Sequence, residues 1–203
     1  MIPDNSTNQT KKMKKQNRDG ILFLRGKKTI LRPLLESDIP RLLRWVNDPE
    51  VRQFITRVFP AMEGDERKWL ERLHQHPDKD MVLMIETLNC VPIGTMGIHG
   101  INWVNRIGIT GAMIGEKSFW GKGYGTDAKM ILLDYAFNRL NLRKIVSRVI
   151  AYNRRSLAYS LHCGYRIEGR LSRVHFNKGR YWDEYVLGLF RHWWLPYWER
   201  YNK

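Results

Sequence analysis

The sequence has few cysteines, no long apolar run and fewer acidic than basic residues. Its two cysteines, Cys90 and Cys163, are too few for the disulfide framework of a small secreted domain. The longest nearly uncharged stretch, residues 81–95, is interrupted by Glu86 and is too short to span a membrane. The first 20 residues are polar and lack the apolar core of a secretory signal. The sequence therefore predicts a cytoplasmic globular protein with no membrane partner.

The shortage of acidic residues leaves the chain strongly basic. Asp and Glu number 20 against 35 Lys and Arg, a formal net charge of +15. Such a chain is attracted to polyanions such as cofactor phosphates, RNA or acidic protein surfaces, although a solvated basic surface is equally compatible. Residues 1–19 are rich in Lys, Asn, Thr and Gln, so we expect a disordered basic leader, with an acidic partner such as the ribosome if it has one. Residues 20–203 are expected to form a single domain.

The apolar pattern after the leader predicts a mixed order of strands and helices. Expected strands are residues 21–34 with a turn at 26–28, 81–85, 93–98, 106–114, 144–152, 165–176 and 181–190. Expected helices are residues 38–48, 65–76, 128–140 and 156–162. This order indicates an α/β fold of the α+β hybrid type, with a mixed, mostly antiparallel sheet of about seven strands flanked by about four helices.

A glycine-rich segment between the expected strand 106–114 and the expected helix 128–140 carries the clearest chemical signal. In Gly121-Lys122-Gly123-Tyr124-Gly125-Thr126, three glycines allow a tight turn with exposed amides, and a helix N-terminus follows. These features suit a diphosphate, although tight turns alone also use glycine. The segment fits neither the nucleotide-triphosphatase loop nor the dinucleotide fingerprint, because the spacing differs and no acidic residue follows between Asp134 and Glu168.

Several motifs in order resemble the GNAT N-acetyltransferase superfamily. Met113-Ile114-Gly115 and the segment from Trp120 to Thr126 look like its acetyl-CoA motif, and Asn153-Arg154-Arg155-Ser156 with Cys163-Gly164-Tyr165 resembles its second motif. Leu31-Arg32-Pro33-Leu34 and the segment from Trp45 to Val51 are similar to the branch of ribosomal-protein N-terminal acetyltransferases. The resemblance covers residues 29–190. It implies an acyltransferase that uses acetyl-CoA.

The resemblance also implies a role for each matching position. Backbone groups of Met113, Ile114 and Gly115 are expected to run beside the pantetheine arm, and amides from the glycine segment to hold the diphosphate. The residues of that segment are Lys122, Gly123, Tyr124, Gly125 and Thr126. Asn153 is expected to contact the far end of the arm, with Ser156 close to the thioester. Trp120 stands where relatives carry Gln or Arg, so one polar phosphate contact is missing.

The proton donor and acceptor are left open at this stage. Many relatives have a tyrosine acid seven residues after the motif Asn, but Ser160 occupies that position here and Tyr159 precedes it. The candidate acids are therefore Ser156, Ser160 and Tyr159. His175, on the strand entering the last hairpin, is the leading candidate base, although a purely structural histidine is equally compatible.

Four other titratable residues are weaker candidates for a general base or for an amine-binding group. His99 and Glu116 are the alternative bases. Asp183 and Glu184 can bind a cationic amine or lie on the surface. No metal-binding spacing of His, Cys, Asp or Glu occurs, so no metal is expected.

The expected reaction is acetyl transfer to a primary amine by direct attack in a ternary complex. A protein N-terminus is the expected acceptor. Two alternatives remain: a small amine such as an amino sugar, amino acid, polyamine or antibiotic, or a basic RNA- or ribosome-binding module. The aromatic-rich tail, residues 191–198, is expected to pack into the core, to form a homodimer contact or to line the substrate site.

Overall fold

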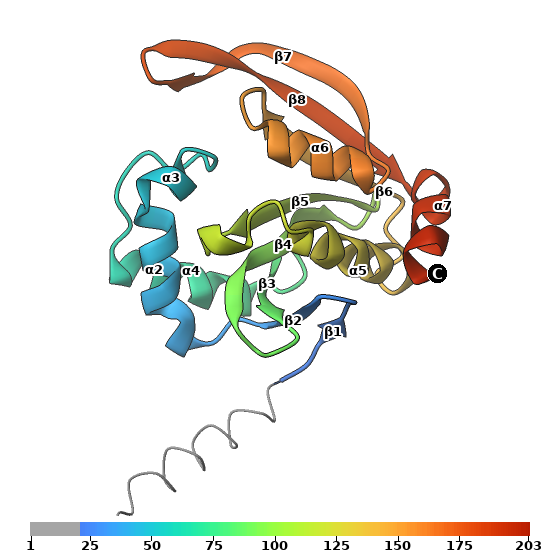
Figure 1. Cartoon of the computed structure of the whole chain (residues 1–203), viewed down its shortest axis with the longest axis horizontal. Coiled ribbons are helices and arrows are strands. Elements are labelled where there is room, and N and C mark those ends of the chain that lie inside the picture. Colours follow the sequence, from blue (N-terminus) through green and yellow to red (C-terminus); the bar gives the residue numbers. More distant parts are fainter. Residues whose placement is uncertain (1–20) are drawn as a thin grey trace, which may run out of the picture.

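A computed structural model describes residues 21–203 (Figure 1), so the predicted leader lies outside the described residues. The strands are β1 Leu24–Arg25, β2 Thr29–Pro33, β3 Met81–Thr87, β4 Pro92–Asn102, β5 Ile107–Ile114, β6 Lys144–Ile150, β7 Arg166–Asn177 and β8 Arg180–Phe190. The helices are α2 Ile39–Asn47, α3 Pro49–Arg52, α4 Glu63–Gln75, α5 Tyr124–Asn138, α6 Arg154–His162 and α7 Arg191–Asn202, with single 3-10 turns η1 Glu36–Asp38 and η2 Lys117–Phe119. The predicted fold class and element order are confirmed, while α3 and α7 are helices that the apolar pattern did not predict.

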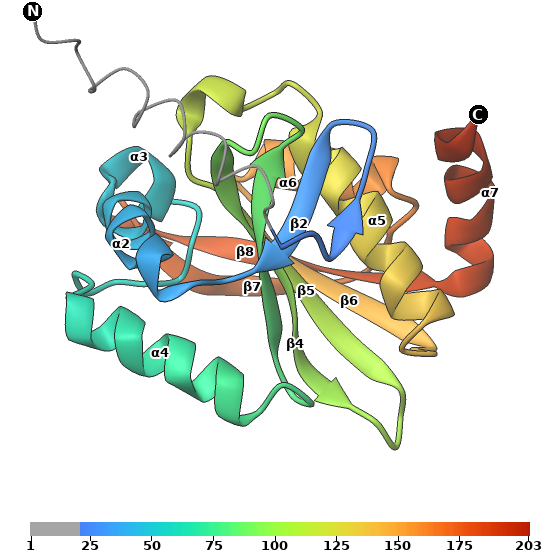
Figure 2. The ribbon, with the colours of Figure 1, turned by 90° about the horizontal axis from the view of Figure 1, so that it is seen from below.

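The described strands form one sheet in the order β1-β2-β3-β4-β5-β6-β8-β7. β5 and β6 run parallel, and the other neighbouring pairs are antiparallel. One face packs on α5, and the opposite face packs on α2 and α4 through a separate apolar cluster. Figure 2 shows α4 and α5 on different sides of the strands, and Figure 1 shows the β7–β8 hairpin arching over α6. No helix among residues 21–203 is long and apolar enough to cross a bilayer.

A short sequence signal explains why the chain turns sharply after α2. The helix expected over residues 38–48 ends at Asp48, which is followed by Pro49. The Asp48 carboxylate accepts hydrogen bonds from the amides of Glu50 at 2.8 Å and Val51 at 3.3 Å. Asp48 therefore ends α2 and at the same time caps α3, with Pro49 in the first helical position.

The aromatic tail forms α7 and contributes to the core. Trp194 is fully buried, and its ring centroid lies 5.2 Å from that of Phe137 in α5 and 5.2 Å from that of Trp198. Core packing thus accounts for Trp194. The homodimer contact stays a prediction.

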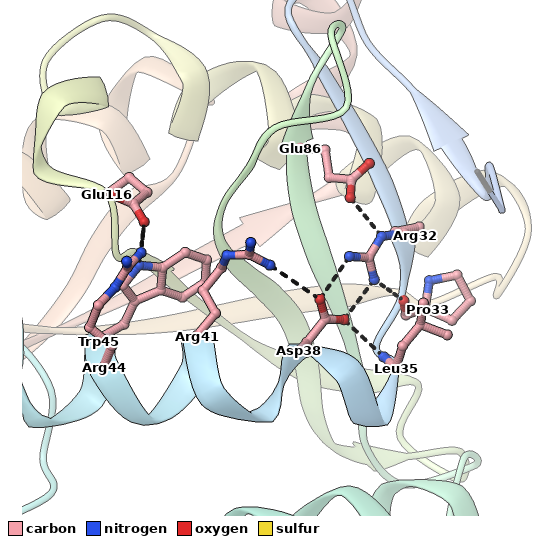
Figure 3. Close-up of polar contacts among 9 residues, drawn as sticks. All are labelled: Arg32, Pro33, Leu35, Asp38, Arg41, Arg44, Trp45, Glu86 and Glu116. Atoms are coloured by element: carbon pink, nitrogen blue, oxygen red, sulfur yellow. Dashed lines mark hydrogen bonds and ion pairs between the residues drawn. The ribbon is translucent and has the colours of Figure 1, made fainter. Parts of the chain in front are cut away.

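A buried ion-pair cluster joins the start of the domain to the sheet (Figure 3). Arg32 Nε donates to Glu86 at 2.7 Å, and Nη1 donates both to Asp38 at 2.7 Å and to the Pro33 carbonyl at 2.8 Å. Although burial opposes it, Arg32 holds the pKa of Asp38 below its usual value. The Leu31-Arg32-Pro33 motif therefore has a structural role: it fixes η1 against β2 and β3.

Candidate active site

The sheet opens between β5 and β6. The two strands pair only from Ile107 with Lys144 to Ile109 with Val146. Beyond that point, residues 110–114 and 147–150 diverge and line cavities instead of bonding each other. Thr110 sits where the strands separate; its hydroxyl lies 3.4 Å from the Val146 carbonyl and 2.8 Å from the Tyr165 hydroxyl. The opening leaves a strand edge of β5 available for a ligand.

Two cavities meet at this opening. A narrow cavity of about 420 Å³ extends between the N-terminal end of α5 and α6. A wide cavity of about 1410 Å³ lies on the opposite side, between α4, the open strands and the β7–β8 hairpin. Both are lined by Phe54, Ile55, Ala112, Met113, Asn153, Ser156 and Tyr159. The shared residues mark the passage from one cavity to the other.

The glycine segment forms the closed end of the narrow cavity. Gly121 and Gly123 have φ angles of 72° and 83°, which favour glycine, and Gly123 is the N-cap of α5 without any side-chain cap. The amides of the first turn of α5 therefore lack intrahelical partners and point toward the cavity end, where the helix dipole is positive. Gly121, Gly123, Tyr124, Gly125 and Thr126 line the cavity. Lys122 does not line it, and its carbonyl instead accepts a hydrogen bond from Lys28 Nζ at 3.2 Å.

Asp127 anchors this segment to two distant parts of the chain. Its carboxylate accepts hydrogen bonds from the amides of Lys27, Lys28 and Thr29 at 2.8 to 3.0 Å and from the Tyr201 hydroxyl at 2.7 Å. The β1–β2 turn and α7 are thereby held against the first turn of α5. The Lys28 ammonium reaches the glycine segment as a result, a cation that the local pattern did not indicate.

A second cation lies on the wall of the narrow cavity. The Arg155 guanidinium in α6 lies 4.1 Å from the Trp120 ring centroid and 5.2 Å from that of Phe54. Trp120 itself donates its indole hydrogen to the Ile114 carbonyl at 2.7 Å. Trp120 therefore does not supply the polar phosphate contact expected from the Gln or Arg of relatives. Its ring instead supports the Arg155 guanidinium, which can contact a phosphate.

The start of α6 places the hydroxyl groups of the shared passage. Asn153 caps the helix by accepting a hydrogen bond from the Ser156 amide at 3.1 Å. Ser156 and Tyr159 line both cavities, whereas Ser160 is fully buried and lines neither. Desolvation raises the pKa of Tyr159, and the neighbouring hydroxyls of Ser160 and Ser156 oppose that rise. Tyr159 is therefore protonated near neutral pH.

In the wide cavity, His175 and Glu184 form a hydrogen-bonded pair. His175 Nε2 lies 2.5 Å from Glu184 Oε2, and Arg148 lies 3.3 Å from the other carboxylate oxygen. Because an ionised carboxylate only accepts, Nε2 carries the hydrogen, and Nδ1 is left as the proton acceptor. Glu184 thus orients the imidazole and is the partner that sequence reasoning did not assign to it.

Of the remaining candidates, His99 lines the wide cavity, whereas Asp183 and Glu116 line neither cavity. Desolvation lowers the pKa of His99, against the effect of Asp80, 3.5 Å away. Asp183 is paired with Arg170 and lies outside both cavities. Glu116 bonds Arg44 and accepts from the Trp45 indole at 3.0 Å (Figure 3), away from the passage.

Gly115 has a steric role in the structure. A Cβ there would lie 2.1 Å from Cγ of Trp45, and the residue lines neither cavity, in contrast to Met113 and Ile114. Within residues 21–203, no group of three or more His, Cys, Asp or Glu is placed to hold a metal ion.

Comparison with known proteins agrees with this geometry. The family model "Acetyltransferase (GNAT) domain" matches residues 28–166. The SPbeta prophage-derived uncharacterized N-acetyltransferase YokL of Bacillus subtilis is 24% identical over 181 residues, which cover 84% of this chain and 94% of that protein. The spermidine N(1)-acetyltransferase of Vibrio cholerae is 30% identical over 124 residues, 61% of this chain and 71% of that protein.

A solved structure shows the same fold. The spermidine N-acetyltransferase of Vibrio cholerae, in complex with CoA and spermine, superposes with a TM-score of 0.76 at 23% identity and covers 82% of this chain and 98% of that one. These matches do not support the narrower resemblance to ribosomal-protein N-terminal acetyltransferases. The family match over most of the chain, together with the opened sheet and the glycine segment before α5, shows that the chain belongs to the GNAT acetyltransferase family and is an N-acetyltransferase with acetyl-CoA as its co-substrate.

Proposed function

We propose that this enzyme acetylates the primary amine of a small molecule bound in the wide cavity, by direct attack on the thioester of acetyl-CoA in a ternary complex. The observation that carries the proposal is the junction of the two cavities at Ser156 and Tyr159. An acceptor entering from the hairpin side and a thioester entering from the α5 side would meet there. Reacting groups held in contact gain most of their rate advantage from such placement.

The narrow cavity fits the shape and charge of the co-substrate. A Cβ at Gly121 would meet no atom within 4 Å, and one at Gly123 would meet only Lys28 Nζ, at 3.4 Å, so both glycines leave room for a diphosphate beside the backbone amides. Arg155 brings positive charge to the wall of this cavity, and Lys28 brings a second positive charge to the glycine segment at its end. The β5 edge at Met113 and Ile114 is available to amide groups of an extended arm.

One residue of the wide cavity and the hydroxyl residues at the junction divide the proposed proton transfers between them. His175 is positioned to accept a proton from the acceptor amine, with Glu184 stabilising the charged imidazole. Tyr159, protonated at neutral pH, is the proposed donor to the departing thiolate, and Ser156 is the neighbouring hydroxyl. Ser160 lacks access to either cavity and is not proposed for this role.

The charges of the wide cavity bear on the acceptor. The Vibrio cholerae relative is named a spermidine N(1)-acetyltransferase, which makes polyamines the first acceptors to test. However, the carboxylates of Asp65 and Glu66 are bonded by Arg57, and Glu184 is paired with Arg148 and His175. Paired carboxylates attract a polycation weakly, so we expect amines with one or two positive charges to be preferred over spermine.

A panel assay tests the proposal. Release of the CoA thiol is followed with spermidine, spermine, short monoamines and diamines, amino sugars, amino acid amides and a set of peptides with free N-termini. Saturable turnover of a small amine, with mass spectrometry showing one added acetyl group, would support the proposal. Turnover of peptides only would replace it.

A protein N-terminus is the second candidate, and the size of the wide cavity favours it. Its volume of about 1410 Å³ exceeds the ~300 to 1,000 Å³ typical of small-ligand pockets. An extended peptide would use that room. The peptide arm of the panel separates this candidate from the first, and a ribosomal partner would appear as a preference for ribosomal-protein N-termini.

A further inference from the structure

One charged side chain of the core takes no part in the proton transfers described above. Lys129 in α5 is fully buried, and no acceptor among residues 21–203 forms a hydrogen bond with its Nζ. An ammonium without hydration or a counter-ion is costly, and an apolar side chain of similar length would avoid that cost. A lysine in this setting is a candidate for a functional role.

Two tyrosine rings face the ammonium in place of a carboxylate. Lys129 Nζ lies 5.4 Å from the ring centroid of Tyr159 and 5.5 Å from that of Tyr165. The Tyr165 hydroxyl contacts Thr110, the residue at which β5 and β6 separate. Tyr159 lines both cavities. The positive charge therefore lies against the ring of a tyrosine that borders both cavities.

Lys129 faces Tyr159, Cys163 and Tyr165, and near neutral pH it is the charged member of this group. Burial lowers the pKa of Lys129 to about 8, with Cys163 opposing, and raises the pKa of Cys163 to about 12. Burial also raises the pKa of Tyr165, and desolvation raises that of Tyr159. His99, across the sheet, has a pKa lowered by desolvation and further by Lys129.

We propose that Lys129 is a positioning residue that acts through Tyr159, its buried positive charge favouring transfer of the tyrosine proton to the sulfur of departing CoA. In this step the O–H bond of Tyr159 breaks and an S–H bond forms. The ammonium stabilises the phenolate that remains. The amine proton, accepted by His175, passes to solvent, and solvent then returns a proton to the phenolate. A nearby charge held in a water-poor site is effective because the dielectric constant there is low. The inference rests on the proposed function, since it requires the thioester at Tyr159.

The test compares Lys129→Met and Lys129→Arg with the wild-type enzyme from pH 6 to pH 10, with a saturating acceptor. We expect Lys129→Met to lower kcat at pH 7 by about 10- to 100-fold, with KM for acetyl-CoA changed less than about twofold. Wild-type kcat should fall above pH 8 as the ammonium loses its proton. Lys129→Arg keeps its charge and should remain active at pH 9, and Lys129→Met should lack the fall at pH 8.

A double-mutant cycle with Tyr159→Phe checks that the effect passes through the tyrosine. Lys129→Met should change kcat little once the hydroxyl is absent; if Tyr159→Phe alone falls below detection, the pH profile decides. An unchanged kcat and pH profile in Lys129→Met, or an equally large loss in the Tyr159→Phe background, would overturn the inference. Absence of turnover by the wild-type enzyme with every amine would instead refute the proposed function. Lys144→Met, which removes a partly exposed lysine paired with Glu168, is the matched control and should leave the pH profile unchanged.

Discussion

Replacing Lys129 by methionine should stabilise the folded protein, and the gain should depend on pH in a defined way. The ordinary lysine pKa of 10.5 falls to about 8 in the fold because burial disfavours the charge. Between these pH values the unfolded chain binds the proton and the folded chain does not, so wild-type stability rises with pH. Below pH 8 the folded protein carries the full free-energy cost of burying the Lys129 ammonium.

The magnitude follows from the size of the shift. A shift from 10.5 to about 8 corresponds to about 3 kcal/mol at ~1.4 kcal/mol per pH unit. Loss of the contacts with the rings of Tyr159 and Tyr165 offsets up to about 1 kcal/mol of this gain. Lys129→Met should therefore raise the free energy of unfolding by about 2 to 3 kcal/mol at pH 7 and the Tm by roughly 5 to 10 °C.

The assay is urea unfolding followed by tryptophan fluorescence at pH 7.0, 8.0, 9.0 and 9.5. The difference between variant and wild type should shrink as the pH rises toward 9.5. Cys163 and Tyr159, whose pKa values are raised in the fold, lower stability above about pH 9 in both proteins, so their effect largely cancels in the difference. Lys144→Met should instead cost about 0 to 1 kcal/mol. Equal stabilities at pH 7, or a difference that does not vary with pH, would refute the reasoning.

Three further predictions concern the co-substrate, the base and the leader. Gly123→Asp should weaken acetyl-CoA binding by on the order of 100-fold in calorimetry, because a carboxylate would face the diphosphate; Gly179→Asp, at a similar φ of 78° in the open hairpin turn, should bind normally, and equal loss in both would show a general folding effect. His175→Ala should lower kcat/KM by ~10²- to 10⁴-fold, with partial recovery at high pH where the amine is already neutral; Glu184→Gln should cost less, and full activity of His175→Ala would transfer the role of base to His99. Deleting residues 1–19 should leave acetyl-CoA affinity intact, and loss of binding would show that the leader belongs to the domain.

Local signals in the sequence predicted much of the site. The glycine segment marks the end of the narrow cavity because glycine is needed where φ is positive, at Gly121 and Gly123. Asn153, which was expected to contact the pantetheine arm, is the N-cap of α6, and its side-chain oxygen accepts a hydrogen bond from the Ser156 amide. The predicted candidates Ser156, Tyr159 and His175 all line the cavities, whereas Ser160 and Gly115 do not.

The sequence by itself determined the strands, the helices α2, α4, α5 and α6 and the family motifs, because these depend on residues a few positions apart. Tertiary structure alone decided that Asp127 bonds amides about 100 residues away, and that Glu184 is the partner of His175. It also decided that Lys129, on a helix whose apolar stripe is clear in the sequence, points into a buried cluster with Tyr159. A side chain's environment depends on which elements pack against its helix, and neither propensity nor periodicity within the helix contains that information.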